Sequence, residues 1–153
     1  MLRISKLTDY GTLVLAQLPV YTKGLTNAGQ VAKATHLPQA TVSKLLKALV
    51  RAGIVVSERG LHGGYALARP DDEISAAEII NAIEGPLAIT ECSSAKGQCS
   101  LEPTCQVGSA WQAINLSIRR ALNEVSLADL QARQAPIQPP RFRNDIISQL
   151  ITR

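Results

Sequence analysis

The sequence has few of the residues that a secreted, membrane-bound or catalytic protein would need. Its 153 residues include three cysteines and two histidines, too few thiols for a small domain stapled by disulfides. No apolar run approaches the ~18–20 residues of a membrane-spanning helix, and no signal peptide is visible. A Walker loop, a dinucleotide fingerprint and a Ser-His-Asp set are all missing. We therefore expect a cytoplasmic protein that is not an enzyme and has no membrane association.

The positive charge is concentrated in the first half of the chain. Residues 1–70 contain five Lys and four Arg against Asp9 and Glu58, a net charge of +7. Residues 71–153 contain seven basic and ten acidic side chains, a net charge of −3. A basic part joined to a mildly acidic part is typical of a nucleic-acid-binding protein with a separate sensing or assembly segment. The same distribution disfavours a small redox enzyme or electron carrier.

The first part of the sequence predicts three helices. An apolar stripe of helical period follows Ser5, a candidate N-cap, and ends before Pro19. Thr26 or Asn27 then caps a short second helix. The third helix is expected over about residues 38–52, because a glycine suited to a helix C-terminus follows it.

A hairpin is expected to follow the third helix. Residues 54–59 and 65–69 have the composition of two short strands, and the sequence GLHGG between them predicts a turn. Two short helices, a longer helix and a hairpin are the elements of a winged helix-turn-helix. The predicted fold class is therefore mainly α, with a two-stranded wing.

The rest of the sequence predicts a loop and a long helix. A capping box at Ser75–Glu78 begins a short apolar helix, and residues 91–105 lack periodicity and hold all three cysteines. Apolar residues then recur at alternating spacings of four and three, which is typical of a helix that pairs with another. The expected dimer interface consists of Trp111, Ile114, Ile118, Leu122 and Val125.

These elements suggest three parts. Residues 1–70 would form the DNA-binding domain, and residues 71–131 would form the cysteine loop and the dimerisation helix. Residues 132–153 are rich in Pro and Arg, a composition typical of a flexible tail.

The third helix has two distinct faces. Val42, Leu45, Leu46 and Leu49 share one face. On the other, small polar side chains would let the backbone approach base edges, while Lys and Arg would neutralise phosphates. An ordinary solvated face is the alternative, which the neighbouring helix and hairpin disfavour. We expect DNA contacts from Gln39, Ala40, Thr41, Ser43, Lys44, Lys47 and Arg51.

The tip of the hairpin is a second candidate DNA contact. Arg59 and His62 lie beside three glycines, which permit positive φ and a close approach to a backbone. An arginine at such a tip can enter the narrow, negative minor groove. For His62, a phosphate contact and simple exposure are equally compatible with the sequence.

The three cysteines are candidate metal ligands. Cys92, Cys99 and Cys105 have the spacing C-x6-C-x5-C, which lacks the close pairs of zinc sites. Iron–sulfur clusters accept cysteine ligands at varied spacings, and three thiolates leave one position for a different residue. Incidental thiols, or a thiol-based sensor that forms a disulfide or a sulfenate, are the alternatives.

Together these motifs resemble the Rrf-two family of winged-helix regulators, which includes IscR and NsrR. The similarity covers residues 1–131 and rests on the LTDYG helix, the third helix, the wing, the EISAAEIINAIEGP segment and the cysteine loop. The LRISKLTDY opening and the ITEC sequence that ends in Cys92 look most like the regulators of SUF-system iron–sulfur cluster assembly.

The resemblance implies a ligand set. Cys92, Cys99 and Cys105 would bind a 2Fe-2S or 4Fe-4S cluster. IscR-type members place a histidine three residues after the last cysteine, where this chain has Gly108. NsrR-type members use an aspartate of the first helix that reaches across the dimer, and Asp9 occupies the matching place. A carboxylate that interacts with the helix dipole is the alternative role of Asp9.

The resemblance also implies a function. The chain would be a homodimer that binds a pseudo-palindromic operator of double-stranded DNA, with its recognition helices roughly 34 Å apart. It would regulate, as a repressor, the genes of iron–sulfur cluster assembly. A regulator that senses nitric oxide or redox stress is a rival, and a cluster-free thiol regulator is another.

Overall fold

Helix α3 (Gln39–Arg51) lies at the centre of the fold. The computed structural model describes residues 4–93 and 105–132. Within it, α3 contacts α1 (Lys6–Leu15), α2 (Ala28–Thr35), α4 (Ala76–Glu84) and strand β1 (Val55–Glu58). The predicted winged helix-turn-helix is therefore confirmed, with α2 and α3 as its paired helices.

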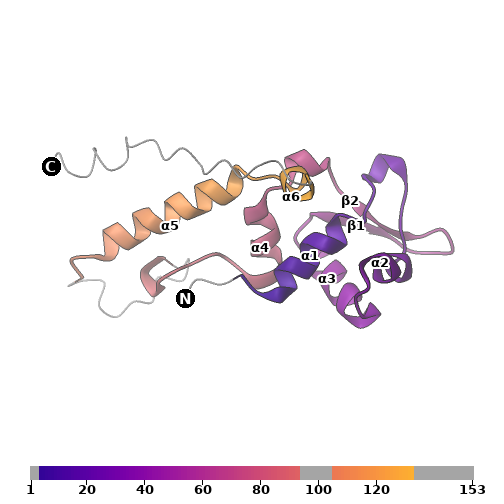
Figure 1. Ribbon diagram of the computed structural model, residues 1–153, viewed down its shortest axis with the longest axis horizontal. Helices are drawn as coiled ribbons and strands as arrows, with labels where there is room; N and C mark the ends of the chain where they lie inside the picture. Colours follow the sequence, from indigo (N-terminus) through magenta and orange to yellow (C-terminus); the bar gives the residue numbers. More distant parts are fainter. Residues whose placement is uncertain (1–3, 94–104, 133–153) are drawn as a thin grey trace.

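The other elements extend this core in two directions. Strand β2 (Gly64–Leu67) pairs antiparallel with β1 to complete the wing. Helix α5 (Gly108–Asn123) projects away from the winged-helix part, and α6 (Leu127–Gln131) returns to it (Figure 1). Short 3-10 turns complete the order: η1 (Tyr21–Lys23), η2 (Asp71–Glu73) and η3 (Glu91–Ser93).

The apolar core is continuous from the first helix to the last. The predicted inner face of α3, formed by Val42, Leu45, Leu46 and Leu49, is buried. The same cluster includes residues from beyond the wing, among them Ile74, Ile79 and Leu127. Because these residues are all but inaccessible to water, α4 and α6 stabilise the same core as the helices that precede the wing.

Short-range capping marks where three of the described helices, α2, α4 and α6, begin. Asn27, rather than Thr26, caps α2. At the C-terminal end of α3, Gly53 adopts a φ of +73°, a conformation that favours glycine. Reciprocal side-chain and backbone hydrogen bonds form complete capping boxes in three pairs: Asn27 with Gln30, Ser75 with Glu78, and Ser126 with Asp129.

Helix α1 is capped from a distance. Ser5 occupies the expected N-cap position, but its side chain makes no capping hydrogen bond. Instead, the Glu84 carboxylate at the end of α4 accepts hydrogen bonds from the Ser5 backbone N–H, at 2.9 Å, and from the Thr8 hydroxyl. These bonds, first the one from Thr8, lower the pKa of Glu84. Ser5 is thus the N-cap residue, as predicted, but the capping bonds are made by a carboxylate 79 residues away and not by the Ser5 hydroxyl.

The other boundaries differ from expectation by a few residues. Helix α5 begins at Gly108 and ends at Asn123, so Val125, the last residue of the expected apolar stripe, lies two residues beyond it. Within the cysteine loop, η3 covers the first cysteine. Residues 94–104, and the tail apart from Ala132, lie outside the described part of the chain.

Replacement of Glu84 by Gln tests the capping of α1. Because the pKa of Glu84 is lowered in the folded state, its stabilising effect is present above its ordinary pKa of 4.5 and is lost as pH falls through the folded value. We expect Glu84→Gln to lower stability at pH 7 by less than about 1 kcal/mol, since the carboxylate is exposed to screening solvent. The difference in stability between Glu84→Gln and the wild type should shrink as the pH falls towards 3.

Thermal unfolding followed by circular dichroism from pH 7 to pH 3 measures this difference. Glu124→Gln, at the exposed end of α5, is the matched control and should leave the unfolding temperature unchanged. A constant difference between Glu84→Gln and the wild type across that range would contradict the assignment.

Candidate nucleic-acid interface and cysteine site

The outer face of α3 carries the side chains that the sequence singled out. Five of them are exposed: Gln39, Ala40, Lys44, Lys47 and Arg51. Thr41 and Ser43 are half-buried, because each lies at the border with the apolar face. The three cationic residues follow one another at spacings of three and four, so they form one positive stripe along the helix.

A tight turn fixes α3 relative to α2. His36, the residue that ends α2, adopts a left-handed conformation with φ +56° and ψ +25°. Leu37 then packs against the core, and Pro38 occupies the N-cap of α3 with an extended backbone. A non-glycine residue at positive φ is uncommon, and here it reverses the chain between α2 and α3.

The wing ends in a closed turn that presents three side chains to solvent. The Gly63 N–H donates to the Gly60 carbonyl at 3.0 Å, and any Cβ at position 63 would collide with the backbone carbonyl of Glu58. Arg59 and His62 are exposed at this tip, as expected. Leu61, between them, is 95% exposed.

Hydrogen bonds attach the wing to the body of the fold. Thr26 and Tyr65 exchange two backbone hydrogen bonds of 2.9 Å, and the Leu67 N–H donates to the Pro19 carbonyl at 2.8 Å. At the outer end of β1, the Tyr21 hydroxyl donates to the Glu58 carboxylate. This hydrogen bond and the negative charge of Glu58 raise the pKa of Tyr21. The wing and the helices therefore form one unit.

The structure describes two of the three cysteines. Cys92 lies in η3, which packs against α5, and Cys105 is exposed three residues before α5 begins. Cys99 lies outside the described residues. Among the described side chains, which include neither Cys99 nor the Cys92 thiol, no group of three or more His, Cys, Asp or Glu is gathered.

Position 108 is adjacent to a thiol. A Cβ on Gly108 would lie 3.5 Å from Sγ of Cys105, an ordinary van der Waals distance. A side chain could therefore be accommodated there, but glycine supplies no donor atom. A fourth ligand, if one binds, has to come from another residue.

Helix α5 exposes part of its predicted apolar stripe. Trp111 and Ile114 are 44% and 45% exposed, and with Ile118 they line a cavity of about 670 Å³ beside the segment that follows α4. Leu122 and Val125, at the other end of the stripe, are half-buried and line a second cavity of about 540 Å³. Neighbouring helices thus cover this stripe only in part.

Asp9 lies at the far end of α5 from the cysteines. It is exposed in the first turn of α1 and lines the second cavity together with Leu122. Fourteen residues of helix separate Leu122 from Gly108, which lies next to Cys105. At 1.5 Å per residue they span roughly 21 Å. Asp9 is therefore too far away to share a site with Cys105 of its own chain.

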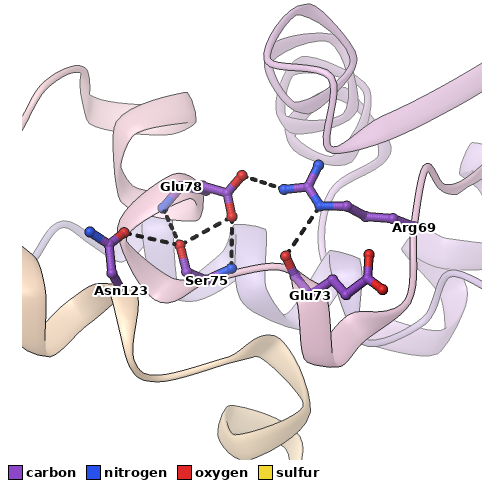
Figure 2. A network of polar contacts seen from close by, with 5 residues as sticks. All are labelled: Arg69, Glu73, Ser75, Glu78 and Asn123. Carbon is purple, nitrogen blue, oxygen red and sulfur yellow. Dashed lines mark hydrogen bonds and ion pairs between the residues drawn. The ribbon is translucent and has the colours of Figure 1, made fainter.

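A polar network joins the wing to α5. Arg69, just after β2, pairs with the Glu78 carboxylate and donates to the Glu73 carbonyl at 3.2 Å (Figure 2). Glu78 also accepts hydrogen bonds from Ser75, whose hydroxyl lies 3.4 Å from Asn123 Oδ1. Burial alone would raise the pKa of Glu78, but the bonds from Ser75 and Arg69 lower it overall.

Two residues of the site were not expected from the sequence. Leu61 lies between the two predicted wing contacts, and its signal was an apolar side chain in a glycine-rich turn. Asn115 is 5% exposed on a helix whose apolar residues are largely exposed. Its signal was a lone asparagine beside an apolar stripe, a residue type that can specify register between helices.

A comparison with protein families decides which family this is. Residues 4–133 match the Rrf2 family, which is described as an iron-dependent transcriptional regulator. This is the Rrf-two family that the sequence motifs resemble. This chain belongs to the Rrf2 family. Rrf2 proteins are DNA-binding transcriptional regulators, not enzymes. No helix among the described residues of this Rrf2 protein is long and apolar enough to cross a membrane.

Curated relatives agree with this assignment. The Rrf2 chain is 31% identical over 153 residues to two proteins of Mycobacterium tuberculosis, MT1325 of strain CDC 1551 / Oshkosh and Rv1287 of strain ATCC 25618 / H37Rv. Both are provisionally named HTH-type transcriptional regulators. Each comparison covers 99% of this chain and 95% of the relative.

Solved structures of Rrf2 relatives include regulators of two kinds. CymR, the global cysteine regulator of B. subtilis, has a TM-score of 0.61 and 29% identity over 85% of this chain and 96% of its own. The oxidized form of Staphylococcus aureus CymR has a TM-score of 0.57, with 25% identity over 88% of this chain and 100% of its own. T. potens IscR has a TM-score of 0.54 and 26% identity, over 88% of this chain and 93% of its own.

Proposed function

We propose that this Rrf2 protein is a homodimeric repressor whose affinity for DNA depends on an iron–sulfur cluster, and that it regulates genes of iron–sulfur cluster assembly. One observation carries the proposal. Two of the three cysteines lie in the segment that joins α4 to α5: Cys92 is in η3, which contacts α5, and Cys105 is three residues before α5 begins. A ligand bound by these cysteines would thus act on the helix that leads back to the DNA-binding part.

For DNA binding we propose the outer face of α3 and the tip of the wing. A groove-reading helix needs small polar side chains near the bases and cations near phosphates. Gln39 and Ala40 begin α3, and the cationic residues follow further along. Arg59 and His62 of the wing lie on a turn that Gly63 keeps tight, which suits insertion into a minor groove.

We propose a second copy of the chain as the partner of α5. Besides Trp111 and Ile114, this helix exposes Leu116, and Val107 just before it is also exposed. Exposed apolar side chains gathered on one element are typical of an interface. A two-fold dimer would place the same residues opposite one another. We propose that the interface uses Trp111, Ile114, Ile118 and Leu122 of α5, together with Val125 just after it.

The donor set fits an iron–sulfur cluster. Three soft thiolates suit iron, and Gly108 leaves space beside the Cys105 sulfur. Cys92, Cys99 and Cys105 would hold the cluster, which supplies an iron site whose integrity responds to iron supply and oxidants. Asp9 would complete the ligands from the partner chain, since it shares a cavity with Leu122, and roughly 21 Å of helix separates Leu122 from Gly108 beside Cys105 of the same chain.

Two rival functions keep specific support. A cluster with one carboxylate ligand would also react with nitric oxide or other small oxidants. A stress regulator would therefore use the same cluster ligands and the same DNA contacts as the regulator proposed above. A cluster-free thiol regulator is supported by the similarity to CymR, whose structure includes an oxidized form, and by the exposed thiol of Cys105. Ligation or oxidation can change DNA affinity only by favouring one state of the loop.

An anaerobic purification tests the cluster. We expect reconstituted protein to be coloured and to contain iron and acid-labile sulfide, and we expect a variant with Cys92, Cys99 and Cys105 changed to Ser to contain neither. Operator binding by the wild type should change when the iron is removed. Colourless wild-type protein without iron would instead favour the thiol regulator. Footprinting of operators in the native genome then separates the cluster-assembly regulator from the stress regulator.

Lys47→Ala tests the contact between α3 and phosphates. The loss of one phosphate contact should weaken binding to many sequences alike and lower the slope of log affinity against log salt by about 1. Fluorescence anisotropy over a salt series measures the slope. Arg120→Ala, exposed on α5, removes the same charge elsewhere and serves as the control. An unchanged slope for Lys47→Ala would contradict the contact.

Arg59→Ala tests the insertion of the wing into a minor groove. A·T-rich DNA has a narrower and more negative minor groove, which attracts arginine. We expect the variant to lose more affinity on operators with A·T-rich flanks than on those with G·C-rich flanks. Equal losses on both kinds of flank would argue against insertion.

Asp9→Ala tests ligation across the dimer. The apo dimer should stay folded while its reconstituted cluster decays faster. A purified heterodimer of one Asp9→Ala chain and one Cys92→Ser chain should regain one intact site if Asp9 acts across the interface. A heterodimer with no wild-type-like cluster would show that Asp9 is not such a ligand.

A further inference from the structure

Helix α5 buries a single residue, and that residue is polar. Asn115 is 5% exposed, while its neighbours Ile114 and Leu116 are 45% and 47% exposed. A buried amide is costly unless its donor and acceptor are both satisfied. The position where α5 is most enclosed therefore holds a group that contributes directional bonds rather than apolar packing.

The partners of Asn115 belong to the segment that leads to the first cysteine. Its Oδ1 accepts from the Ile89 N–H at 3.3 Å, and its Nδ2 donates to the Leu87 carbonyl at 3.5 Å. The Leu87 N–H in turn donates to Asn81 Oδ1 of α4 at 3.2 Å. Two asparagine side chains, one on each helix, thus hold the backbone of this segment between α4 and α5.

The position of Cys92 depends on these bonds. It follows Ile89 by three residues, a reach of at most about 10 Å. After Cys92, Ser93 lines a cavity of about 260 Å³ together with Asn115, Leu116 and other residues of α5. Apolar contacts are non-directional, so they would leave the segment free to slide along α5. The Asn115 amide prevents this sliding.

We propose that Asn115 is a positioning residue for the cysteine site: it fixes the register of residues 87–89 along α5, and so the place of Cys92 relative to Cys105, which leads into the same helix. The inference rests on the proposed function, because it concerns the ligands of the cluster. Asn115 would act through the backbone of Leu87 and Ile89, with which it forms its hydrogen bonds.

The first experiment needs no iron. In full-length apo protein with Cys99→Ser, exchange with glutathione measures the effective concentration of the Cys92 and Cys105 thiols for each other. Leucine is similar in size to asparagine, and we expect Asn115→Leu to lower this effective concentration at least fivefold. Asn115→Asp keeps the acceptor for the Ile89 N–H, so it should lower the effective concentration less. Asn123→Leu makes the same change eight residues further along α5 and should have no effect.

A second measurement checks the bonds themselves. Hydrogen exchange at the Ile89 amide should accelerate at least tenfold in Asn115→Leu and stay at the wild-type rate in Asn123→Leu. If Asn115→Leu does not fold by circular dichroism, Asn115→Ala takes its place in both measurements. Faster exchange at Ile89 with an unchanged effective concentration would overturn the proposal, because Asn115 would then hold the backbone without positioning Cys92.

The cluster provides the third measurement. If the wild type binds iron, a chelator should remove it several-fold faster from Asn115→Leu than from the wild type or Asn123→Leu. An unchanged rate of iron loss would overturn the role of Asn115 in the cluster site. If the wild type binds no iron, the proposed function fails, whereas the thiol and exchange measurements still decide whether Asn115 positions Cys92.

Discussion

The rest of the structure depends on the burial of one face of α3. Leu46 and Leu49 are inaccessible to water, and the helix contacts α1, α2, α4 and β1 at once. Because every apolar residue of that face is used in the core, the opposite face with Lys44 and Lys47 has no neighbour within the fold. The outward stripe of charge is thus a direct result of the packing.

Most of the fold could be predicted because its signals are local. Capping boxes span four residues, and Gly53 ends α3 where a positive φ is needed. Such patterns are legible in a single sequence. Ser5 was correctly predicted as the N-cap residue of α1, but the role of Glu84 was not predicted, because it lies 79 residues beyond Ser5. No pattern within a helix can reveal a partner that only the tertiary fold brings close.

The site shows the same division between local and distant information. The sequence identified which side chains of α3 and the wing would be exposed, since amphipathic period and turn chemistry decide that locally. From the sequence we expected the whole apolar stripe of this helix to form one face that packs against a second chain. In the structure Leu122 and Val125 are half-buried near α1 and α6, and the Val125 carbonyl accepts from the Ala76 N–H at 2.8 Å. The segment at the end of α5 is therefore attached to α4, while the beginning of α5 lies against η3 and the segment that follows α4. Figure 1 shows α5 extending away from the winged-helix part.

The backbone bonds that attach β2 to Thr26 and Pro19 have a consequence for the shape of the bound DNA. They tie the hairpin to the segments that precede α2, so, if α3 and the wing both contact DNA as proposed, these bonds would limit changes in the span between the two contacts. An operator must then match that span by its own curvature. Base steps that bend and twist easily would be favoured even where no side chain reaches them. Selection among promoters would then rest partly on the stiffness of the double helix.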